Sequence, residues 1–392
     1  MIQLQDIDLQ TFLSEYWQKK PLILRNALPG FQSPVAPDEL AGLSLEDEVE
    51  SRIVIQHGEQ DYELKKGPFD EDTYANLPEQ NWTLLVQGMD RLIPEVTAIL
   101  DEFDFLPRWR IDDIMVSYAT TGGNVGPHFD HYDVFLLQAA GKRRWMLTSQ
   151  DCVESNYIEG VDLRLMKTFK IEQDEVFEAG DILYLPPKWG HHGVALDDEC
   201  MTYSIGYRTY RGQELWDSFG DHLSEMAAFR QLYQDPTWPV ELNPGEVTDH
   251  AVDQAQALLN TILQDKALLK AWFGRFATQL DQGAAQQLPE PLSEEETAEF
   301  SEFVDALSAC EGMEKDPVCR FAYADKVTSD CTPEGQTVLY INGAIWDKQG
   351  ASEDFVHALC NLPWLAPEEL QDETNHALLY DLWKLQYLVF IE

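Results

Sequence analysis

The chain has 392 residues, 44% of them hydrophobic, and a formal net charge of −43 at pH 7. Its length predicts two or three domains, because one domain usually holds roughly 100–200 residues. Its acidity argues against direct binding of nucleic acid and is compatible with a basic partner, and no apolar run is long enough to span a membrane. We therefore expect a cytoplasmic globular protein without membrane contact.

The first part of the chain mixes short helical patterns with β-like runs. Two amphipathic patterns near the start predict helices, the first of which should stop at Pro21. Two short alternating runs predict a strand pair with its turn at His57 and Gly58. A further helical stretch is expected before residue 105. These segments are residues 8–21, 37–48, 52–56 paired with 61–65, and 82–104.

From Trp109 onward, β-like runs dominate the sequence. Clusters of Gly, Pro and Asp bound these runs, at spacings that suit an antiparallel barrel or sandwich. The predicted strands cover residues 114–120, 133–138, 143–148, 181–186 and 201–208.

The last part of the chain changes texture. Residues 213–285 are helical in pattern, with apolar residues at three- and four-residue spacing, and residues 281–291 look like a linker. Residues 286–392 predict a small mixed domain, in which Ser293 and Glu296 have the spacing of a capping box at the start of a helix. Two strand-like runs and two helical stretches should follow. The amphipathic helices of residues 213–285 could pack within one chain or between two copies.

The cysteines give no sign of a metal site. None forms a CxxC pair, and a cytosolic chain normally keeps scattered cysteines reduced. We expect all six to be packing residues: Cys152, Cys200, Cys310, Cys319, Cys331 and Cys360.

A histidine and an aspartate separated by one residue are the first chemical signal. His128 and Asp130 lie in the segment GPHFDHYDVF, and on a strand such residues face the same way. One imidazole and one carboxylate can therefore share a metal ion, and a second histidine would complete a facial triad that leaves coordination positions open. The motif alone is weak, because surface histidines and turn aspartates occur in many proteins.

The second histidine should come from a later strand, and LYLPPKWGHHG offers His191 or His192. We favour His191, with His192 exposed or behind the ligands. His131 directly follows Asp130 and would face away from it on a strand. The set His128, Asp130 and His191 suits Fe(II), which needs open positions for a bidentate co-substrate and for oxygen.

An enzyme that uses 2-oxoglutarate also needs a cation for the far carboxylate. Strand alternation puts Arg143 on the same face as Trp145 and Leu147, which should be the inner face. A buried arginine is costly unless it meets an anion, so Arg143 is the candidate anchor, and the alternative is an internal salt bridge. Ser117 could donate its hydroxyl to the same carboxylate, although a serine on a strand is often merely tolerated.

The segments that contain these candidate residues resemble those of a known family, the JmjC ribosomal oxygenases. The likeness is greatest to the bacterial branch that hydroxylates an arginine of a large-subunit ribosomal protein, the sixteenth in the usual numbering. It covers the first 210 residues or so closely and the remainder more by architecture. The segments that carry it include GPHFDHYDVFLLQ, KRRWM, EAGDILYLPPKWGHHGVAL and MTYSIGYR.

The resemblance implies a fold and a function. The fold is an α+β multidomain chain with a double-stranded β-helix (JmjC, cupin-like) catalytic domain, a helical dimerisation region and a C-terminal winged-helix-like domain. We assign these to residues 1–212, 213–285 and 286–392 respectively. The family also implies Fe(II), 2-oxoglutarate and O2, metal ligands at His128, Asp130 and His191, and co-substrate contacts at Ser117 and Arg143.

The expected function is therefore arginine hydroxylation on a basic ribosomal protein by a cytoplasmic homodimer. Residues 293–392 contain 5 Lys or Arg against 21 Asp or Glu, a balance that opposes phosphate binding by this domain. Three alternatives stay open at this stage: the same chemistry on a histidine or another residue, a metal-binding cupin without 2-oxoglutarate, and a silent acidic scaffold. Residues suited to an arginine pocket are Asp112, Asp113, Tyr118, Tyr132 and Trp189.

Overall fold

The structure, a computed structural model, divides the chain into two compact units. Unit 1 comprises Met1–Thr209 and Gln282–Gln287, and unit 2 comprises Tyr210–Asp281 and Leu288–Glu392. In the described part of the chain, no helix has the length and apolar character needed to span a bilayer. The residues that the structure describes are 2–5, 7–224, 226–241, 243–329 and 332–391.

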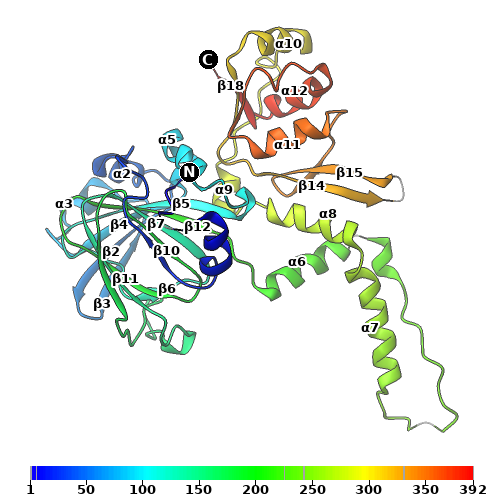
Figure 1. The fold of residues 1–392 in the computed structure, drawn as a ribbon, viewed down its shortest axis with the longest axis horizontal. Coiled ribbons are helices and arrows are strands. Elements are labelled where there is room, and N and C mark those ends of the chain that lie inside the picture. The colour runs from blue at the N-terminus through cyan, green and yellow to red at the C-terminus, as the bar shows by residue number, and fades with distance from the viewer. Residues whose placement is uncertain (1, 6, 225, 242, 330–331, 392) are drawn as a thin grey trace. The chain divides into compact units, whose positions relative to one another are not determined.

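Unit 1 is built on two antiparallel sheets (Figure 1). The larger sheet has the strand order β1-β10-β7-β12-β5-β4-β2-β3, and the smaller one has the order β6-β11-β8-β9. The larger sheet consists of β1 (Leu22–Leu24), β2 (Ser51–Gly58), β3 (Asp61–Lys66), β4 (Trp82–Val86), β5 (Ile111–Ala119), β7 (Asp133–Ala140), β10 (Ile182–Leu185) and β12 (Cys200–Tyr207). The smaller sheet consists of β6 (His128–Phe129), β8 (Arg143–Thr148), β9 (Gln173–Phe177) and β11 (Gly190–Ala195).

The strands predicted after Trp109 are confirmed as β5, β7, β8, β10 and β12. Their alternation separates two faces of the larger sheet. On β5, Ile114 and Val116 belong to the main hydrophobic core, whereas Met115 and Ser117 line a pocket that residues of both sheets surround. The expected antiparallel arrangement of strands is therefore confirmed, and the residues that line the pocket lie on the inner face of the larger sheet.

The main core of unit 1 lies on the other face of the larger sheet, where aromatic rings from distant segments meet. Phe12 packs edge-on against Tyr184 with ring centroids 5.3 Å apart, and Phe103 lies 5.0 Å from Phe135. Such ring pairs stabilise a core beyond their buried area. The first pair joins η1 to β10, and the second joins η2 to β7, so both helical segments are fixed to the larger sheet.

Three predictions for unit 1 need correction. The helix expected over residues 8–21 ends at Tyr16, well before Pro21, and the hairpin turns at Glu59 and Gln60 rather than at His57 and Gly58. The helical stretch expected from Trp82 begins instead with strand β4, because a short apolar run such as WTLLV suits a buried strand as well as a helix. The helical segments of unit 1 are α1 (Leu9–Thr11), η1 (Phe12–Tyr16), α2 (Pro37–Leu43), α3 (Glu71–Ala75), α4 (Met89–Leu92), α5 (Pro94–Thr97), η2 (Ala98–Phe103), η3 (Arg108–Arg110), η4 (Glu154–Asn156) and α9 (Gln282–Gln286).

Unit 2 contains helices packed with two small antiparallel sheets of order β17-β13-β18 and β14-β15-β16. The helical pattern of residues 213–285 is confirmed as α6, α7 and α8, and the two late helical stretches are confirmed as α11 and α12. The helices are α6 (Gly212–Ser224), η5 (Ala227–Arg230), α7 (Asp249–Leu263), α8 (Lys266–Ala277), α10 (Phe300–Ala309), α11 (Glu353–Asn361), η6 (Glu373–Asn375) and α12 (His376–Lys384). The strands are β13 (Gly312–Lys315), β14 (Phe321–Ser329), β15 (Thr332–Ile341), β16 (Ala344–Trp346), β17 (Trp364–Leu365) and β18 (Leu388–Ile391).

Two further predictions are wrong in detail. The expected linker, residues 281–291, contains helix α9, which belongs to unit 1. Ser293 does bond to the carboxylate of Glu296, but this pair forms a turn, and the helix begins at Phe300 with Glu299 as its N-cap. The boundaries between a helical dimerisation region and a winged-helix-like domain stay a prediction. Within unit 2, α8 packs on the β14–β15 hairpin, since the Tyr340 hydroxyl donates to the Lys270 carbonyl.

The described cysteines are free thiols, as expected for packing residues. Cys152, Cys200 and Cys360 are buried, and Cys310 and Cys319 are partly buried. Cys331 lies outside the described residues.

Candidate metal and co-substrate site

Two short strands of the smaller sheet bring the predicted metal ligands together. β6 pairs with β11 in a register that sets His128 opposite His191, so both imidazoles leave the same face. Their ring centroids are 4.2 Å apart, and His191 Nε2 lies 3.6 Å from Asp130 Oδ2. One ligand atom from each of His128, Asp130 and His191 lies within 4.8 Å of the other two.

The two imidazoles are oriented by backbone carbonyls. His128 Nδ1 lies 2.9 Å from the Gly126 carbonyl, and His191 Nδ1 lies 3.1 Å from the Trp189 carbonyl. Each Nδ1 therefore carries the proton and donates it, which leaves both Nε2 atoms free to coordinate a metal. Burial, reinforced by the charge of His128, lowers the pKa of His191 to about 4, so this imidazole is neutral and able to coordinate at neutral pH.

Close packing fixes the metal-facing side of β11. A Cβ atom on Gly193 would lie 2.5 Å from the Trp145 ring, so only glycine lets the indole approach this strand. Trp145 in turn lies 5.9 Å from the ring of His191. Gly126 adopts a φ of +79°, which favours glycine in the loop that leads to His128. These glycines were not singled out from the sequence, because the need for them depends on contacts between distant strands.

Arg143 lies inside unit 1, as strand alternation predicts. It is 3% exposed, and Trp145 and Leu147 on the same face are buried as well. Its Nε donates to the Cys200 thiol at 3.3 Å, and its guanidinium carbon lies 5.6 Å from the centre of the Trp145 ring. Nη2 is buried and has no hydrogen-bond partner among the described residues. Within that part of the chain no carboxylate pairs with Arg143, which argues against an internal salt bridge and leaves the guanidinium available for an external anion.

Ser117 lies on the same inner face and lines the same pocket as Arg143 and the three candidate ligands. It is 4% exposed, and its hydroxyl donates to the Thr202 carbonyl at 3.3 Å, a long bond that an incoming carboxylate oxygen could replace. Thr202 and Ser204, neighbours on β12, also line the pocket and were not predicted. Their signal in the sequence is the alternation of MTYSIGYR, which puts these two hydroxyls on one face.

The neighbouring histidines have other partners. His192 Nε2 lies 3.2 Å from Asn124 Oδ1, and burial lowers the pKa of His192 to about 4. His131 Nε2 lies 3.6 Å from Glu154 Oε1, and His131 lines the pocket instead of facing away from it as the sequence suggested. The register of β6 and β11 therefore favours His191 over His192 as the ligand, as the sequence analysis proposed.

Of the residues suggested for an arginine pocket, only Tyr132 lines the pocket, and Asp113 lies close to pocket residues along β5 without lining the pocket itself. Asp113 shares a face of β5 with Met115 and Ser117, and its Oδ2 accepts hydrogen bonds from Gln87 Nε2 at 2.7 Å and from the Gly88 amide at 2.8 Å. Burial, with the charges of Asp90 and Asp112, raises the pKa of Asp113 to about 7. The charge of Asp130 raises the pKa of Tyr132, which lines the pocket and is 42% exposed.

The other three suggested residues are engaged elsewhere. Asp112 accepts from Arg208 Nε at 3.0 Å, and the Tyr118 hydroxyl donates to the Asp198 carbonyl at 2.8 Å. Trp189 packs against the small apolar cluster behind β8. Like Asp113, none of the three is among the residues that line the pocket.

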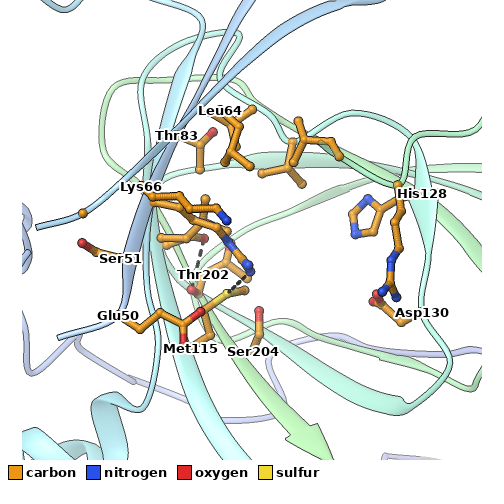
Figure 2. Close-up of a pocket in the computed structure, with 18 of the residues that line it drawn as sticks. Glu50, Ser51, Leu64, Lys66, Thr83, Met115, His128, Asp130, Thr202 and Ser204 are labelled. Atoms are coloured by element: carbon orange, nitrogen blue, oxygen red, sulfur yellow. Dashed lines mark hydrogen bonds between the residues drawn. The ribbon is translucent and has the colours of Figure 1, made fainter. Parts of the chain in front are cut away.

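The pocket has a volume of about 990 Å³ and a charged mouth. Figure 2 shows His128 and Asp130 on one side of it and Leu64, Lys66 and Thr83 on the opposite side. The mouth includes the acidic run Asp47, Glu48 and Glu50 as well as Arg52, whose Nη2 donates to Met115 Sδ at 3.3 Å. A pocket of this size can hold both 2-oxoglutarate and a long side chain from a second substrate.

Helix α9 is a part of the mouth that the sequence analysis missed. Gln282, Gly283 and Gln286 line the pocket, and Gln287 Nε2 donates to the Glu48 carbonyl at 3.2 Å. This segment looks like a linker in the sequence because it has no apolar face of its own, and its placement depends on contacts with a loop more than two hundred residues earlier.

The residues present fit a divalent metal and a dicarboxylate. Two imidazoles and one carboxylate are the donor set of a 2-His-1-carboxylate iron site. A buried guanidinium nitrogen without a partner among the described residues, on the wall of the same pocket, suits the far carboxylate of a keto acid.

The sequence is similar to family models and to proteins that are described as ribosomal oxygenases. Residues 98–215 match the model of the JmjC domain, and residues 261–389 match that of the ROXA-like winged helix, as the predicted fold requires. The chain is 37% identical over 280 residues to the "Ribosomal protein uL16 3-hydroxylase" of Escherichia coli, covering 71% of this chain and 74% of that protein. It is 38% identical over 205 residues to a "Probable ribosomal oxygenase" of Haemophilus influenzae, covering 52% of this chain and 50% of that protein.

Solved structures extend the likeness over the whole chain. An X-ray structure of E. coli YcfD superposes with a TM-score of 0.85 at 32% identity and covers 100% of both chains. A structure of the same protein described as a ribosomal oxygenase in complex with cobalt and 2-oxoglutarate has a TM-score of 0.83 at 32% identity, again over 100% of both chains.

Proposed function

We infer the function from one premise: this chain belongs to the JmjC ribosomal oxygenases. It is an Fe(II)- and 2-oxoglutarate-dependent oxygenase that hydroxylates a ribosomal protein. One observation carries the assignment. A cluster of two histidines and an aspartate faces the same pocket as a buried arginine that no described carboxylate neutralises. Neither a cupin without 2-oxoglutarate nor a silent scaffold has a use for that arginine.

We propose His128, Asp130 and His191 as the ligands of Fe(II), and Arg143 with Ser117 as the contacts of the far carboxylate of 2-oxoglutarate. With O2, the bound metal and co-substrate supply the oxidising power: 2-oxoglutarate becomes succinate and carbon dioxide, and one oxygen atom enters a C–H bond of the substrate. The protein's own part is to keep both imidazoles pointed inward, to orient the keto acid, and to seat the substrate side chain beside the metal.

The proposed target is an arginine side chain of the large-subunit ribosomal protein uL16, after the name of the E. coli relative. Tyr132, which lines the pocket, supports this choice because a guanidinium can lie against an aromatic ring, and Asp113 adds a carboxylate on the face of β5 that carries the pocket residues Met115 and Ser117. An arginine beside Asp113 would also stabilise the ionised carboxyl, whose pKa burial raises to about 7. The acidic run Asp47, Glu48 and Glu50 at the mouth suits a basic protein.

Mass spectrometry of uL16 tests this function. The protein is incubated with the enzyme, Fe(II), 2-oxoglutarate and O2, next to a matched reaction with His128→Ala. We expect a gain of one oxygen atom on an arginine with the native enzyme and none with the variant. Oxygen gained on a histidine would retain the chemistry and replace the target. Absence of succinate with every ribosomal protein tried would refute the oxygenase assignment.

We propose that the chain forms a homodimer through α6 and α7. In helix α7 no residue is buried, yet Val252, Leu259 and Leu263 recur at helical spacing and are 53%, 45% and 39% exposed. Trp216 on α6 is 58% exposed. Such apolar side chains are costly in water, and a second copy of the same surface would cover them. Light scattering should give twice the chain mass, and Val252→Asp with Leu259→Asp should give a monomer.

We further propose that the enzyme works in the cytoplasm on free uL16, without binding nucleic acid itself. The net charge of −43 supports this, because a surface so acidic is repelled by ribosomal RNA. Hydroxylation of free uL16 should therefore be faster than hydroxylation of uL16 in assembled large subunits. Equal rates on the two substrates would contradict the proposal.

A further inference from the structure

Five polar side chains form a buried cluster at one end of the pocket of unit 1, which we call the inner polar cluster. They are Ser117 on β5, Gln138 on β7, Arg143 on β8, and Cys200 and Thr202 on β12, with exposed fractions of 4%, 1%, 3%, 0% and 2%. Polar groups are rarely so completely buried without a purpose, because each must replace the water it loses.

The register of the larger sheet assembles this cluster. Thr202 pairs with Ser117 on one side and with Gln138 on the other, so the three side chains stand in one row across β5, β12 and β7. Cys200 lies two residues before Thr202 and therefore faces the same way. Arg143 comes from the smaller sheet, directly after the turn that follows β7.

Hydrogen bonds link the row to the guanidinium. The Thr202 hydroxyl donates to Gln138 Oε1 at 3.1 Å, and Gln138 Nε2 donates to the Ala140 carbonyl at 2.7 Å and to the Cys200 sulfur at 3.5 Å. The same sulfur accepts from Arg143 Nε at 3.3 Å. Gln138 is thus fixed at both ends of its amide, and Cys200 lies between it and the arginine.

The chemistry of these partners matters as much as their positions. A thiol is a weak, neutral acceptor, so Cys200 can orient Nε without cancelling the positive charge. A carboxylate in its place would form a buried ion pair and leave the guanidinium little attraction for a ligand. Arg143 Nη2 has no partner within the described residues, and its charge is therefore kept for an anion that enters the pocket.

We propose that Cys200 and Gln138 are positioning residues for 2-oxoglutarate: Gln138 fixes the Cys200 sulfur, and that sulfur aims the Arg143 guanidinium at the far carboxylate. This inference rests on the proposed function, in which Arg143 binds that carboxylate. Neither Cys200 nor Gln138 lines the pocket, so both act through Arg143 and not on the ligand.

A pair of ligands tests the proposal by calorimetry, with Mn²⁺ in place of iron so that no turnover occurs. 2-Oxoglutarate and 2-oxobutyrate share the keto-acid end, but only the first has a far carboxylate. Cys200→Ala should weaken binding of 2-oxoglutarate roughly fivefold to tenfold, the usual effect of one lost hydrogen bond, and leave 2-oxobutyrate unchanged. Cys200→Ser should restore part of the loss, and Gln138→Met should lower the affinity in the same selective way.

The controls distinguish a change in the orientation of the Arg143 guanidinium from a general loss of folding stability. Cys152→Ala removes another buried thiol of unit 1 and should leave the ratio of the two affinities unchanged. Equal weakening of both ligands by Cys200→Ala, or no weakening of either, would overturn the proposal. Where Cys200→Ala does not fold, the ratio measured for Gln138→Met decides. If the native protein binds the two keto acids equally well, the far carboxylate contributes nothing to binding. That result would refute both Arg143 as its anchor and 2-oxoglutarate as the proposed co-substrate.

Discussion

Two neighbouring histidines on β11 differ in their surroundings although they are adjacent in the chain. His191 faces His128 across the strand pair and lies 3.6 Å from Asp130 Oδ2. His192 faces the other way and meets Asn124. Alternation along a strand separates the two roles, so exchanging them would require the register of β6 and β11 to shift by one residue.

We predict that His191→Ala and His192→Ala have different effects on metal binding. Loss of one of three ligands should weaken Mn²⁺ binding by at least tenfold, whereas loss of His192 should leave it within about threefold of the native value. Calorimetric titration of Mn²⁺ into each protein measures this. The reverse order of effects would assign His192 as the ligand.

Asp113 shows how one buried carboxyl ties stability to pH. Its pKa rises from an ordinary 3.8 to about 7 in the folded protein, mainly through burial. Between these two values the folded protein keeps a proton that the unfolded chain releases. The contribution of Asp113 to the free energy of unfolding therefore falls as pH rises through this window, and the penalty is complete above pH 7.

We predict that Asp113→Asn removes this penalty. The amide oxygen can accept the same bonds from Gln87 and Gly88 and carries no charge at any pH. The melting temperature of the variant relative to the native protein should therefore be higher at pH 8 than at pH 5, by about 5 °C. Calorimetric scans of both proteins at the two pH values measure it. A constant difference would show that Asp113 keeps an ordinary pKa.

At the scale of elements, α9 is a short helix with a large effect on the mouth of the pocket. It brings Gln282 and Gln286 to the rim, beside the acidic run that begins at Asp47. Its neutral side chains leave the local charge negative, which suits an approaching basic protein.

We predict that Gln286→Lys raises the KM for uL16 about threefold to tenfold, because the new charge repels a basic substrate at short range. The KM for 2-oxoglutarate should not change, since the co-substrate site lies deeper in the pocket. Gln371→Lys adds the same charge to an exposed position of unit 2 and serves as the control. Equal effects of the two substitutions would show that only overall charge matters.

Elements whose residues alternate or repeat within a short stretch of sequence could be predicted. Elements whose position depends on contacts with segments far away in the sequence could not. The inward face of Arg143 follows from alternation along β8, whereas β6 ends at Phe129 and Asp130 lies directly after the strand on which the HxD pair was expected. In contrast, β9 has the polar sequence QDEVF and lies at the edge of its sheet, so nothing in it alternates. The inner polar cluster needs the register of three strands, which a single sequence does not contain.

At the scale of the whole molecule, charge is the dominant property. Acids outnumber bases by 70 to 27, so the enzyme attracts a basic partner over a distance that dissolved salt sets. Such attraction mainly raises the rate of association. It acts little on a small ligand that is already inside the pocket.

We predict that raising the ionic strength from about 0.05 M to 0.2 M lowers kcat/KM for uL16 several-fold, because the Debye length shortens from roughly 14 Å to 7 Å. Binding of 2-oxoglutarate, measured with Mn²⁺, should change less than twofold over the same range. Steady-state rates at a series of salt concentrations test this. A salt-independent kcat/KM would mean that surface charge does not steer the substrate.

Helix α9 also sets the order in which the working enzyme comes into existence. The segment 282–287, which contains this helix, belongs to unit 1, while the chain on either side of it belongs to unit 2. During synthesis, the candidate metal ligands are complete once β11 has left the ribosome, but the rim waits until a further stretch of unit 2 has been translated. A nascent or proteolysed chain that ends before residue 282 would therefore have the candidate metal ligands but lack Gln282 and Gln286 at the pocket mouth. In such a chain, substrate selectivity that depends on this part of the mouth would be acquired after the metal site.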